Sequence, residues 1–237
     1  MAIKGIKYIS FHEPSGYSHA ARQNMIALKN AGIPITWTPM VFGENGYIPL
    51  EDTILDDPHL GSICNKKIEY DHVIVHTVPE YFPFWEQKEQ CKKIIGNTVW
   101  ETDKIPNHWK PLLQSVDLLF VPTLWNKKVF EQCGITTPIE IVPHIIEQHD
   151  HHRHHKTEEY TFYCIETWTA RKAIWDTVTA YLNTFTAADN TLLVIKTTKR
   201  DFTKPRLGPF SHSTKRALKK LIRRHKNPAR IQLINDV

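Results

Sequence analysis

Two adjacent cations, Arg171 and Lys172, directly precede a segment with helical periodicity, and their type and placement point to phosphate chemistry. An arginine can form paired hydrogen bonds to two phosphate oxygens, and the partial positive charge at the start of a helix adds to the attraction. Lys196 ends the next predicted strand and is expected at the same edge of the sheet. These three residues predict a diphosphate site, against the alternative that an Arg-Lys pair is only part of a solvated surface.

A second candidate lies in the loop between the first predicted strand and the first predicted helix. Gly16 stands where the strand meets the helix, so backbone there can approach a ligand closely. The free N–H groups of the helix start would attract an anion, with Ser15 and Tyr17 on either side. The alternative is an ordinary turn in which Ser15 caps the helix.

Polar side chains also follow three apolar segments. His76 ends one predicted strand, Glu101 and Asp103 follow the next, and His144 follows a later one. In open α/β sheets the carboxyl ends of the strands face the ligand crevice. Glu101 and Asp103 can bind hydroxyl groups or act as a base. The alternatives are that His76 is a core histidine and that the Glu101 loop is merely solvated.

The histidines at 149, 151, 152, 154 and 155 invite a comparison with metal sites. Clustered imidazoles beside Asp150 can coordinate zinc or nickel. A flexible run rarely holds a fixed geometry, whereas a catalytic metal needs a shaped site. We therefore expect a linker here and chemistry that needs no metal.

Alternating strands and helices must position these residues. We predict strands at 5–11, 33–40, 72–77, 97–100, 118–121 and 139–142, and helices at 17–31, 86–95, 109–115 and 124–133. Residues 43–67 read as an irregular excursion with at most one short helix. After the histidine run we predict strands at 160–165, 191–197 and 231–234, and helices at 173–185 and 213–226.

This order predicts an α/β protein with parallel sheets and helices on both faces. We expect an N-terminal Rossmann-like domain at 1–147, a linker at 148–159 and a second Rossmann-like domain at 160–237. Three strands make a poor parallel sheet, since both its faces and both its edges need cover. The second domain is therefore expected to be incomplete in this chain.

Composition narrows the function classes only slightly. The 237 residues are 41% hydrophobic and 23% charged, with a formal charge of +5. No segment resembles a signal peptide or a membrane span, and the four cysteines are widely spaced, so a cytoplasmic protein with reduced thiols is expected. The basic helix at 215–226 suits acidic lipid at a membrane surface or nucleic acid, although most such helices simply bury an apolar stripe.

Several segments, in order and spacing, resemble the retaining glycosyltransferases of family 4, which have the two-domain GT-B fold and include glycogen synthases and mannosyltransferases. The segments are Ser15-Gly16-Tyr17-Ser18, Val99-Trp100-Glu101-Thr102-Asp103, Val121-Pro122-Thr123 with Trp125-Asn126, Val142-Pro143-His144, and Phe162 through Trp168 with Arg171-Lys172. Two features depart from the family. Glu166 stands near the usual glycine and arginine, and the family's later acidic motif has no counterpart.

The resemblance implies transfer of a sugar from a nucleotide-diphosphate donor to a glycan or lipid-linked acceptor, as in polysaccharide biosynthesis, with retention. Gly16, Arg171, Lys172 and Lys196 would bind the donor. His76 and Glu101 would orient the acceptor hydroxyl, and the remaining acceptor contacts would come from Ser15, Tyr17, Asp103 and His144.

Two other hypotheses remain open. One is that the chain is a non-catalytic glycan-binding module. The other is that it is a half-enzyme that needs a homodimer partner or a complementing C-terminal half. A third, nucleic-acid binding, is disfavoured because aromatic residues are not interleaved with the basic helix.

Overall fold

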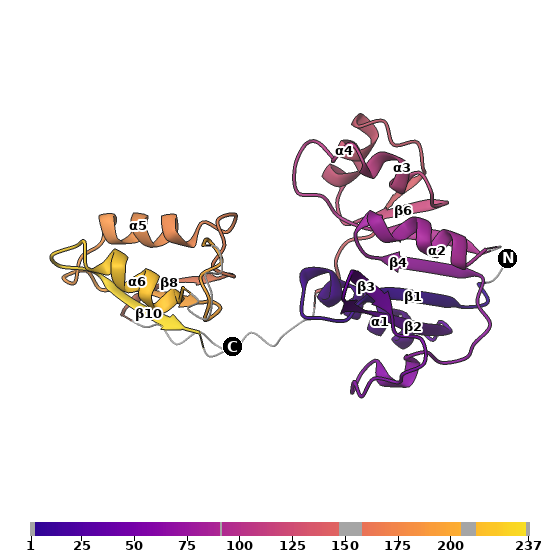
Figure 1. Cartoon of the computed structure of the whole chain (residues 1–237), viewed down its shortest axis with the longest axis horizontal. Helices are drawn as coiled ribbons and strands as arrows, with labels where there is room; N and C mark the ends of the chain where they lie inside the picture. Colours follow the sequence, from indigo (N-terminus) through magenta and orange to yellow (C-terminus); the bar gives the residue numbers. More distant parts are fainter. Residues whose placement is uncertain (1–2, 91, 147–157, 205–211, 236–237) are drawn as a thin grey trace. The chain divides into compact units, whose positions relative to one another are not determined.

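The computed structural model describes residues 3–90, 92–146, 158–204 and 212–235. The chain divides into two compact units, Met1–His149 and Asp150–Val237, called unit 1 and unit 2 below (Figure 1). The boundary between them falls in the segment interpreted as a linker. The histidine run lies outside the described residues.

Unit 1 is built on a sheet whose strands run in the order β3-β2-β1-β4-β5-β6-β7. All neighbouring strands are parallel except β2 and β3, which form an antiparallel hairpin. The strands are β1 (Ile6–Phe11), β2 (Ile35–Gly43), β3 (Gly46–Pro49), β4 (His72–His76), β5 (Lys93–Asn97), β6 (Leu118–Val121) and β7 (Ile139–Ile141).

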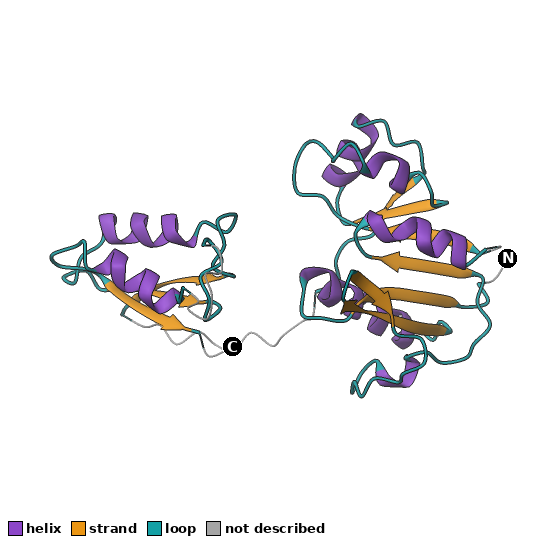
Figure 2. Ribbon diagram, in the orientation of Figure 1, coloured by secondary structure: helices purple, strands orange, loops and turns teal. Residues whose placement is uncertain are grey.

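Helices cover both faces of this sheet, as the sequence predicts (Figure 2). The helices are α1 (Gly16–Asn30), α2 (Phe82–Lys88), α3 (Trp109–Leu113) and α4 (Leu124–Gln132), with short 3₁₀ turns at Gly61–Ile63 and Pro79–Tyr81. From β1 the chain moves to β2 on one side, and from β4 onward it moves to the other. Because parallel crossovers are right-handed, this reversal sends α1 to one face and the later helices to the opposite face. Open α/β sheets bind ligands at the carboxyl ends of the strands where such a reversal occurs, which here are β1 and β4.

Each face of the sheet has its own hydrophobic core. The core under α1 contains Tyr8, Met25 and Trp37, and the core under the later helices contains Phe82 and Trp85. Phe82 and Trp85 are 0% exposed, and burying such a side chain contributes about 1.5–3 kcal/mol. The two cores pack against both faces of β1, β4 and β5, the strands whose carboxyl ends carry the candidate residues.

Unit 2 has a parallel three-stranded sheet in the order β10-β9-β8 within the described residues. Its elements are β8 (Tyr160–Ile165), α5 (Ile174–Thr184), β9 (Thr191–Lys196), α6 (Thr214–Ile222) and β10 (Arg230–Ile234). Both helices pack into one core on one face, so the expectation of helices on both faces is wrong for unit 2. The reason is topological: β8, β9 and β10 follow one another in one direction, and right-handed crossovers then place both helices on the same side.

Three details of unit 1 also differ from the sequence prediction. The helix predicted at 86–95 is wrong: α2 ends at Lys88, and residues 93–97 form β5 instead of a strand at 97–100. Ile94 and Ile95 are buried in a strand that pairs with β4 and β6, and this tertiary context overrides the local helical preference. The excursion at 43–67 contains β3, which pairs with β2 through Gly46 at a φ of 122°.

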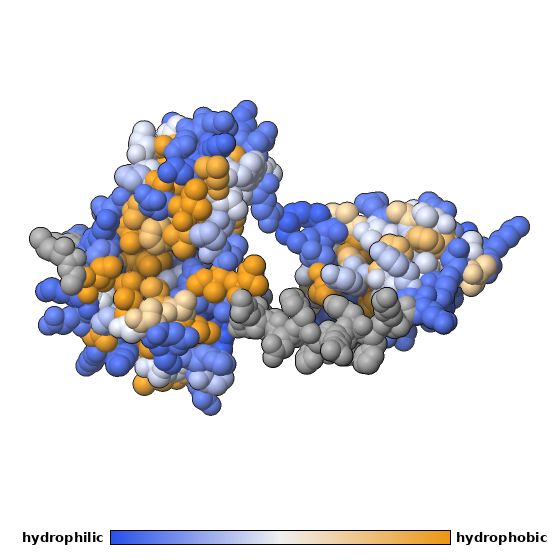
Figure 3. All heavy atoms as spheres, turned by 180° about the vertical axis from the view of Figure 1, so that it is seen from behind, coloured by the Kyte–Doolittle hydropathy of each residue, from blue (hydrophilic) through white to orange (hydrophobic). Residues whose placement is uncertain are grey.

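The surface of unit 1 is not uniformly polar. Figure 3 shows hydrophobic residues gathered in a band across one face of this unit. Large exposed side chains of unit 1 include Phe42, Ile54 and Ile146, which are 72%, 74% and 85% exposed. Apolar patches of this kind often mark contact surfaces. In the described part of the chain, no helix is long and apolar enough to cross a bilayer.

Candidate functional site

The start of α1 is organised by a reciprocal cap. The Ser15 hydroxyl accepts a hydrogen bond from the Ser18 backbone N–H at 3.2 Å, and the Ser15 N–H donates to Ser18 Oγ at 3.0 Å. Ser15 therefore caps the helix, as the alternative interpretation of this loop expects. Gly16 is the first residue of the helix, and it is exposed with no heavy atom within 4 Å of the place a side chain would occupy. Neither its φ nor crowding requires a glycine there, so the open space lies on the solvent side of the loop.

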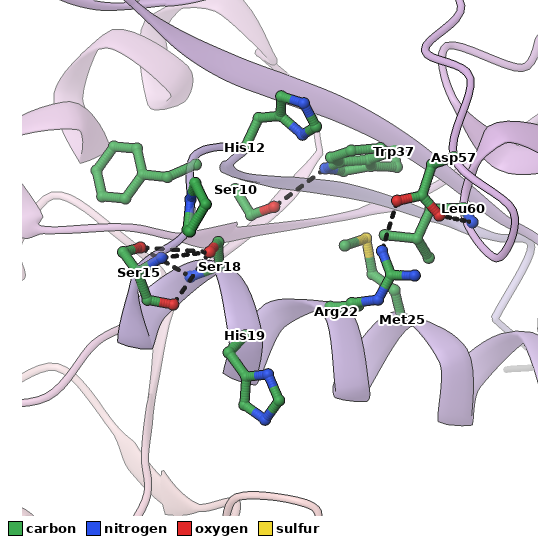
Figure 4. Close-up of a pocket in the computed structure, with 12 residues that line it drawn as sticks. Ser10, His12, Ser15, Ser18, His19, Arg22, Met25, Trp37, Asp57 and Leu60 are labelled. Carbon is green, nitrogen blue, oxygen red and sulfur yellow. Dashed lines mark hydrogen bonds and ion pairs between the residues drawn. The ribbon is translucent and has the colours of Figure 1, made fainter. Parts of the chain in front are cut away.

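A polar pocket of about 270 Å³ lies beside this loop (Figure 4). It is lined by Ser10, His12, Ser15 and Ser18 at the end of β1 and the start of α1, and further by His19, Arg22, Trp37 and Asp57. The Trp37 indole N–H donates to Ser10 Oγ at 3.0 Å, which fixes one wall. Hydroxyl and imidazole groups therefore face a hollow large enough for a sugar-sized ligand.

The far wall of the pocket is an ion pair. Arg22 Nη1 lies 2.5 Å from Asp57 Oδ2. Burial raises the pKa of Asp57, but hydrogen bonds from Arg22 and from the Leu60 and His59 backbone N–H groups outweigh it and lower the pKa to about 2. Arg22 lies on the same helical face as Ser15 and Ser18, so its spacing in the sequence could have indicated that it lines the same site. Nothing in the sequence indicated that Asp57, 35 residues away in the irregular excursion, would pair with it.

His76 lies beneath the crevice and is buried, with 3% of its surface exposed. Its Nδ1 is 2.8 Å from the Tyr8 hydroxyl, and the Tyr17 ring packs edge-on at 5.9 Å between centroids. Burial, with a smaller effect from nearby His144, lowers the pKa of His76 to about 3. His76 is thus a neutral imidazole at physiological pH, so any effect on a ligand passes through the residues above it.

Tyr17 links the first helix to the end of β5. Its hydroxyl is 2.9 Å from Thr98 Oγ1 and donates to the Val99 carbonyl at 3.3 Å. Burial raises the pKa of Tyr17, the hydrogen bonds lower it, and the charge of Glu101 contributes to raising it.

The charge of Glu101 thus acts on Tyr17, and that of His144 on His76, which places these four predicted acceptor-side residues near one another in two pairs. Glu101 and His144 are exposed at this edge. Asp103 is exposed in the same loop as Glu101, and no described contact joins it to this group.

The sequence analysis missed a carboxylate in this crevice. Glu13 accepts a hydrogen bond from the Tyr47 hydroxyl through Oε1, while Oε2 is shielded from solvent and has no partner among the described residues. Burial, and then the bond to Glu13, raises the pKa of Tyr47 to about 12. Tyr47 belongs to the β2–β3 hairpin that the sequence did not reveal, so no sequence signal placed these groups together.

In unit 2 the predicted cations lie directly before α5. Arg171 is exposed, and Lys172 Nζ is 3.0 Å and 3.2 Å from the two carboxylate oxygens of Glu166. The Lys172 ammonium is therefore paired with a carboxylate in this structure. Helix α5 begins after Ala173 without a side-chain cap, which leaves N–H groups of its first turn available to an anion.

Lys196 reaches the same edge but projects from the other face of the sheet. It is the register partner of Ile165, and its carbonyl accepts the Glu166 N–H at 3.1 Å. The preceding Ile195 points into the core beneath α5, and side chains alternate along a strand, so Lys196 is exposed on the face opposite α5. The sequence correctly predicted that Lys196 lies at the end of its strand, but it could not show on which face of the sheet the side chain lies.

No described group of three His, Cys, Asp or Glu side chains is placed to hold a metal ion. Residues 149–155, the sequence candidates for a metal, are not among those described.

The buried histidine predicts a specific dependence of stability on pH. The folded chain binds fewer protons than the unfolded chain between about pH 3 and pH 6.5, so stability falls as the pH falls through this window. We expect unit 1 to lose about 1.4 kcal/mol between about pH 7.5 and pH 5.5 from this group. His76→Asn should remove that loss in urea unfolding, whereas exposed His59→Asn should keep it. An unchanged pH dependence in His76→Asn would contradict the assignment.

Comparison with known proteins supports the fold. Over 98% of its length the chain is similar to a solved structure of trehalose-6-phosphate synthase from E. coli, a GT-B glycosyltransferase, bound with UDP-2-fluoro glucose. The TM-score is 0.52, the identity 12%, and 73% of that chain is covered. No protein-family model matches the sequence, and a search of curated proteins finds no match. The chain thus has the mixed α/β architecture of Rossmann-like domains found in GT-B proteins.

Proposed function

We propose that this chain is a glycosyltransferase that takes a sugar from a nucleotide-diphosphate donor and passes it to a glycan or lipid-linked acceptor with retention. The observation that carries the proposal is the GT-B likeness over nearly the whole chain, in which both units take part. The candidate residues of each unit support it, because they lie at the carboxyl ends of parallel strands, where open α/β sheets bind ligands.

Unit 2 would hold the leaving diphosphate. Arg171 would bind its oxygens in pairs, and the uncapped start of α5 would add N–H donors and a partial positive charge. Lys172 would exchange its contact with Glu166 for one with phosphate, and Lys196 would add charge at the same edge. Such fixed groups stabilise charge that develops in the transition state, so no metal ion is required of the mechanism.

Unit 1 would hold the acceptor. Glu101 would accept the hydrogen bond of the attacking hydroxyl, with Asp103, His144 and Ser15 as further polar contacts. Neutral His76 would act as a positioning residue through Tyr8 and Tyr17. The pocket beside Ser15 offers hydroxyl and imidazole groups to a sugar ring. Gly16 would let the backbone approach either substrate.

The direct test incubates the full chain with UDP-glucose and other nucleotide sugars. Binding is measured by calorimetry, and release of the nucleoside diphosphate is measured with sugar and glycan acceptors present. Binding with acceptor-dependent release would support transfer. If no nucleotide sugar binds, the proposal is wrong.

Gly16→Ala separates a ligand-contacting glycine from a structural one. The side chain would enter open space, and alanine favours a helix, so the free energy of unfolding should change by less than about 1 kcal/mol. If substrate approaches this backbone, kcat/KM should fall by about tenfold or more, because a misplacement of this size affects alignment strongly. Exposed Gly32, at a φ of 74°, provides the opposite control: Gly32→Ala should strain the turn and leave kcat/KM of the folded protein unchanged.

One observation favours a second function. The Lys172–Glu166 ion pair occupies a cation that the transfer reaction would use. A non-catalytic glycan-binding module, or a half-enzyme that needs a partner, would tolerate this pairing. Glycan binding by unit 1 without nucleotide-sugar binding would favour that alternative.

A further inference from the structure

The basic residues of the chain are strongly segregated. Of its 30 Lys and Arg residues, 13 lie between Lys196 and Asn235, while only one of its 25 Asp and Glu residues lies there. The formal charge of +5 is therefore the sum of a strongly basic segment and a remainder of the chain that carries net negative charge. A field this asymmetric attracts anionic partners to one surface.

Helix α6 displays much of this charge. Leu218 and Leu221 are 5% and 2% exposed and pack into the core of unit 2. The cations of the helix and of the segment that follows it all remain exposed; they are Lys215, Arg216, Lys219, Lys220, Arg223, Arg224 and Lys226. Within the described residues, no ion pair joins any of them to an acidic side chain. Because the apolar stripe is already buried, the exposed face can act only through its charge.

A small hollow at the start of α6 concentrates the charge. It measures about 130 Å³ and is lined by Lys204, His212, Arg216 and Lys220 together with Trp175 and Asp201. The carboxylate of Asp201 is already engaged, because Oδ1 accepts from the Thr203 N–H at 2.9 Å and the Thr203 hydroxyl at 2.5 Å. Three cations and an imidazole, against one carboxylate, therefore surround a space that fits one phosphate group.

We propose that α6 and this hollow bind the phosphate headgroups of an anionic membrane. Clusters of four to eight Lys and Arg on an amphipathic helix are typical of surfaces that bind anionic lipid. Phe202 is 46% exposed beside Arg200, whose guanidinium lies 4.8 Å from its ring, and an aromatic next to a cation suits the headgroup layer.

Lipid suits the surface better than nucleic acid does. The exposed side chains of α6 itself are Lys and Arg. The nearby aromatic rings of Phe202 and Trp175 are each covered by an arginine, so α6 offers no aromatic face on which successive bases could stack. Lipid headgroups move laterally and can match irregularly spaced cations. This inference does not depend on the proposed transfer reaction.

The test sediments the full chain with vesicles of phosphatidylcholine alone and with vesicles that also contain phosphatidylglycerol. We expect binding to the anionic vesicles only, decreasing with salt. Lys219→Glu with Lys220→Glu should weaken it by about tenfold or more, since each cation near the surface adds to affinity. The matched control, Lys66→Glu with Lys67→Glu, makes the same charge change on exposed lysines of unit 1 and should bind as the unmodified chain does.

Circular dichroism verifies that each variant is folded, and Lys219→Ala with Lys220→Ala repeats the test without introducing acids. Absence of binding to anionic vesicles would overturn the proposal, as would equal losses in the unit 1 control. Duplex DNA is the competing probe: tighter binding to DNA than to vesicles at the same salt concentration would identify a nucleic-acid surface instead.

Discussion

Replacing Arg171 and Lys172 together with alanine is expected to reduce the turnover of a nucleotide sugar by about 100- to 1,000-fold, the effect of removing preorganised charge from a transition state. The change should also weaken binding of UDP itself, because under the proposed function the same groups would contact the diphosphate in the ground state. Both side chains are at least partly exposed ahead of α5, so unfolding should be nearly unchanged. Calorimetry with UDP and a kcat measurement with the donor provide the two readouts.

The matched control is Lys66→Ala with Lys67→Ala, which removes another adjacent pair of exposed cations from unit 1. It should leave UDP affinity unchanged. Equal losses in both double variants would mean that net charge, not a site at α5, attracts the nucleotide.

A substitution of Glu166 provides a second test of the proposed diphosphate site. The Glu166 carboxylate pairs with Lys172 in this structure and would compete with phosphate for that cation. Both side chains are about one-third exposed, so the pair is weak, and Glu166→Gln should raise UDP affinity by about 2- to 5-fold. A decrease in affinity would mean that Glu166 positions Lys172 for the ligand instead of opposing it.

Trp168→Ala is expected to have the largest effect on stability. Trp168 is 0% exposed in the core of unit 2, and its carbonyl accepts the Phe202 N–H at 2.9 Å. Truncating a buried tryptophan costs about 3–5 kcal/mol, a large part of the stability of a small domain. Because Trp168 lies in the loop that carries Arg171, nucleotide binding should be lost with the fold of this unit. Urea unfolding followed by far-UV circular dichroism measures the change.

Two variants separate the effect from a general cost of losing tryptophan. The Trp168 indole N–H has no hydrogen-bond partner among the described residues, so Trp168→Phe keeps most of the packing and should cost less than half as much. Trp125 is 46% exposed on α4, and Trp125→Ala should change stability by less than about 1 kcal/mol. The assignment fails if Trp125→Ala is as damaging as Trp168→Ala.

Some elements of the fold depend only on residues close together in the chain and could be predicted from the sequence. The strands at 118–121 and 160–165 have the predicted bounds, because each is a short apolar or aromatic run between polar and turn-forming residues. The start of α1 was also readable, since Ser15 and Gly16 supply a cap and a helix entry. The helix expected at 86–95 is wrong because a short apolar run such as Ile94-Ile95 fits both a helix and a buried strand, and only the neighbouring strands decide between them.

The sequence by itself determined the alternation of strands and helices, and with it the loops that carry Gly16, Glu101 and Arg171. These features depend on residues close together in the chain, where periodicity and turn chemistry act. The tertiary structure decided the contacts between distant segments. It buried His76 beneath Tyr17, paired Arg22 with Asp57 across 35 residues, and set both helices of unit 2 on one face. Such contacts depend on strand order and register, which no short stretch of sequence specifies.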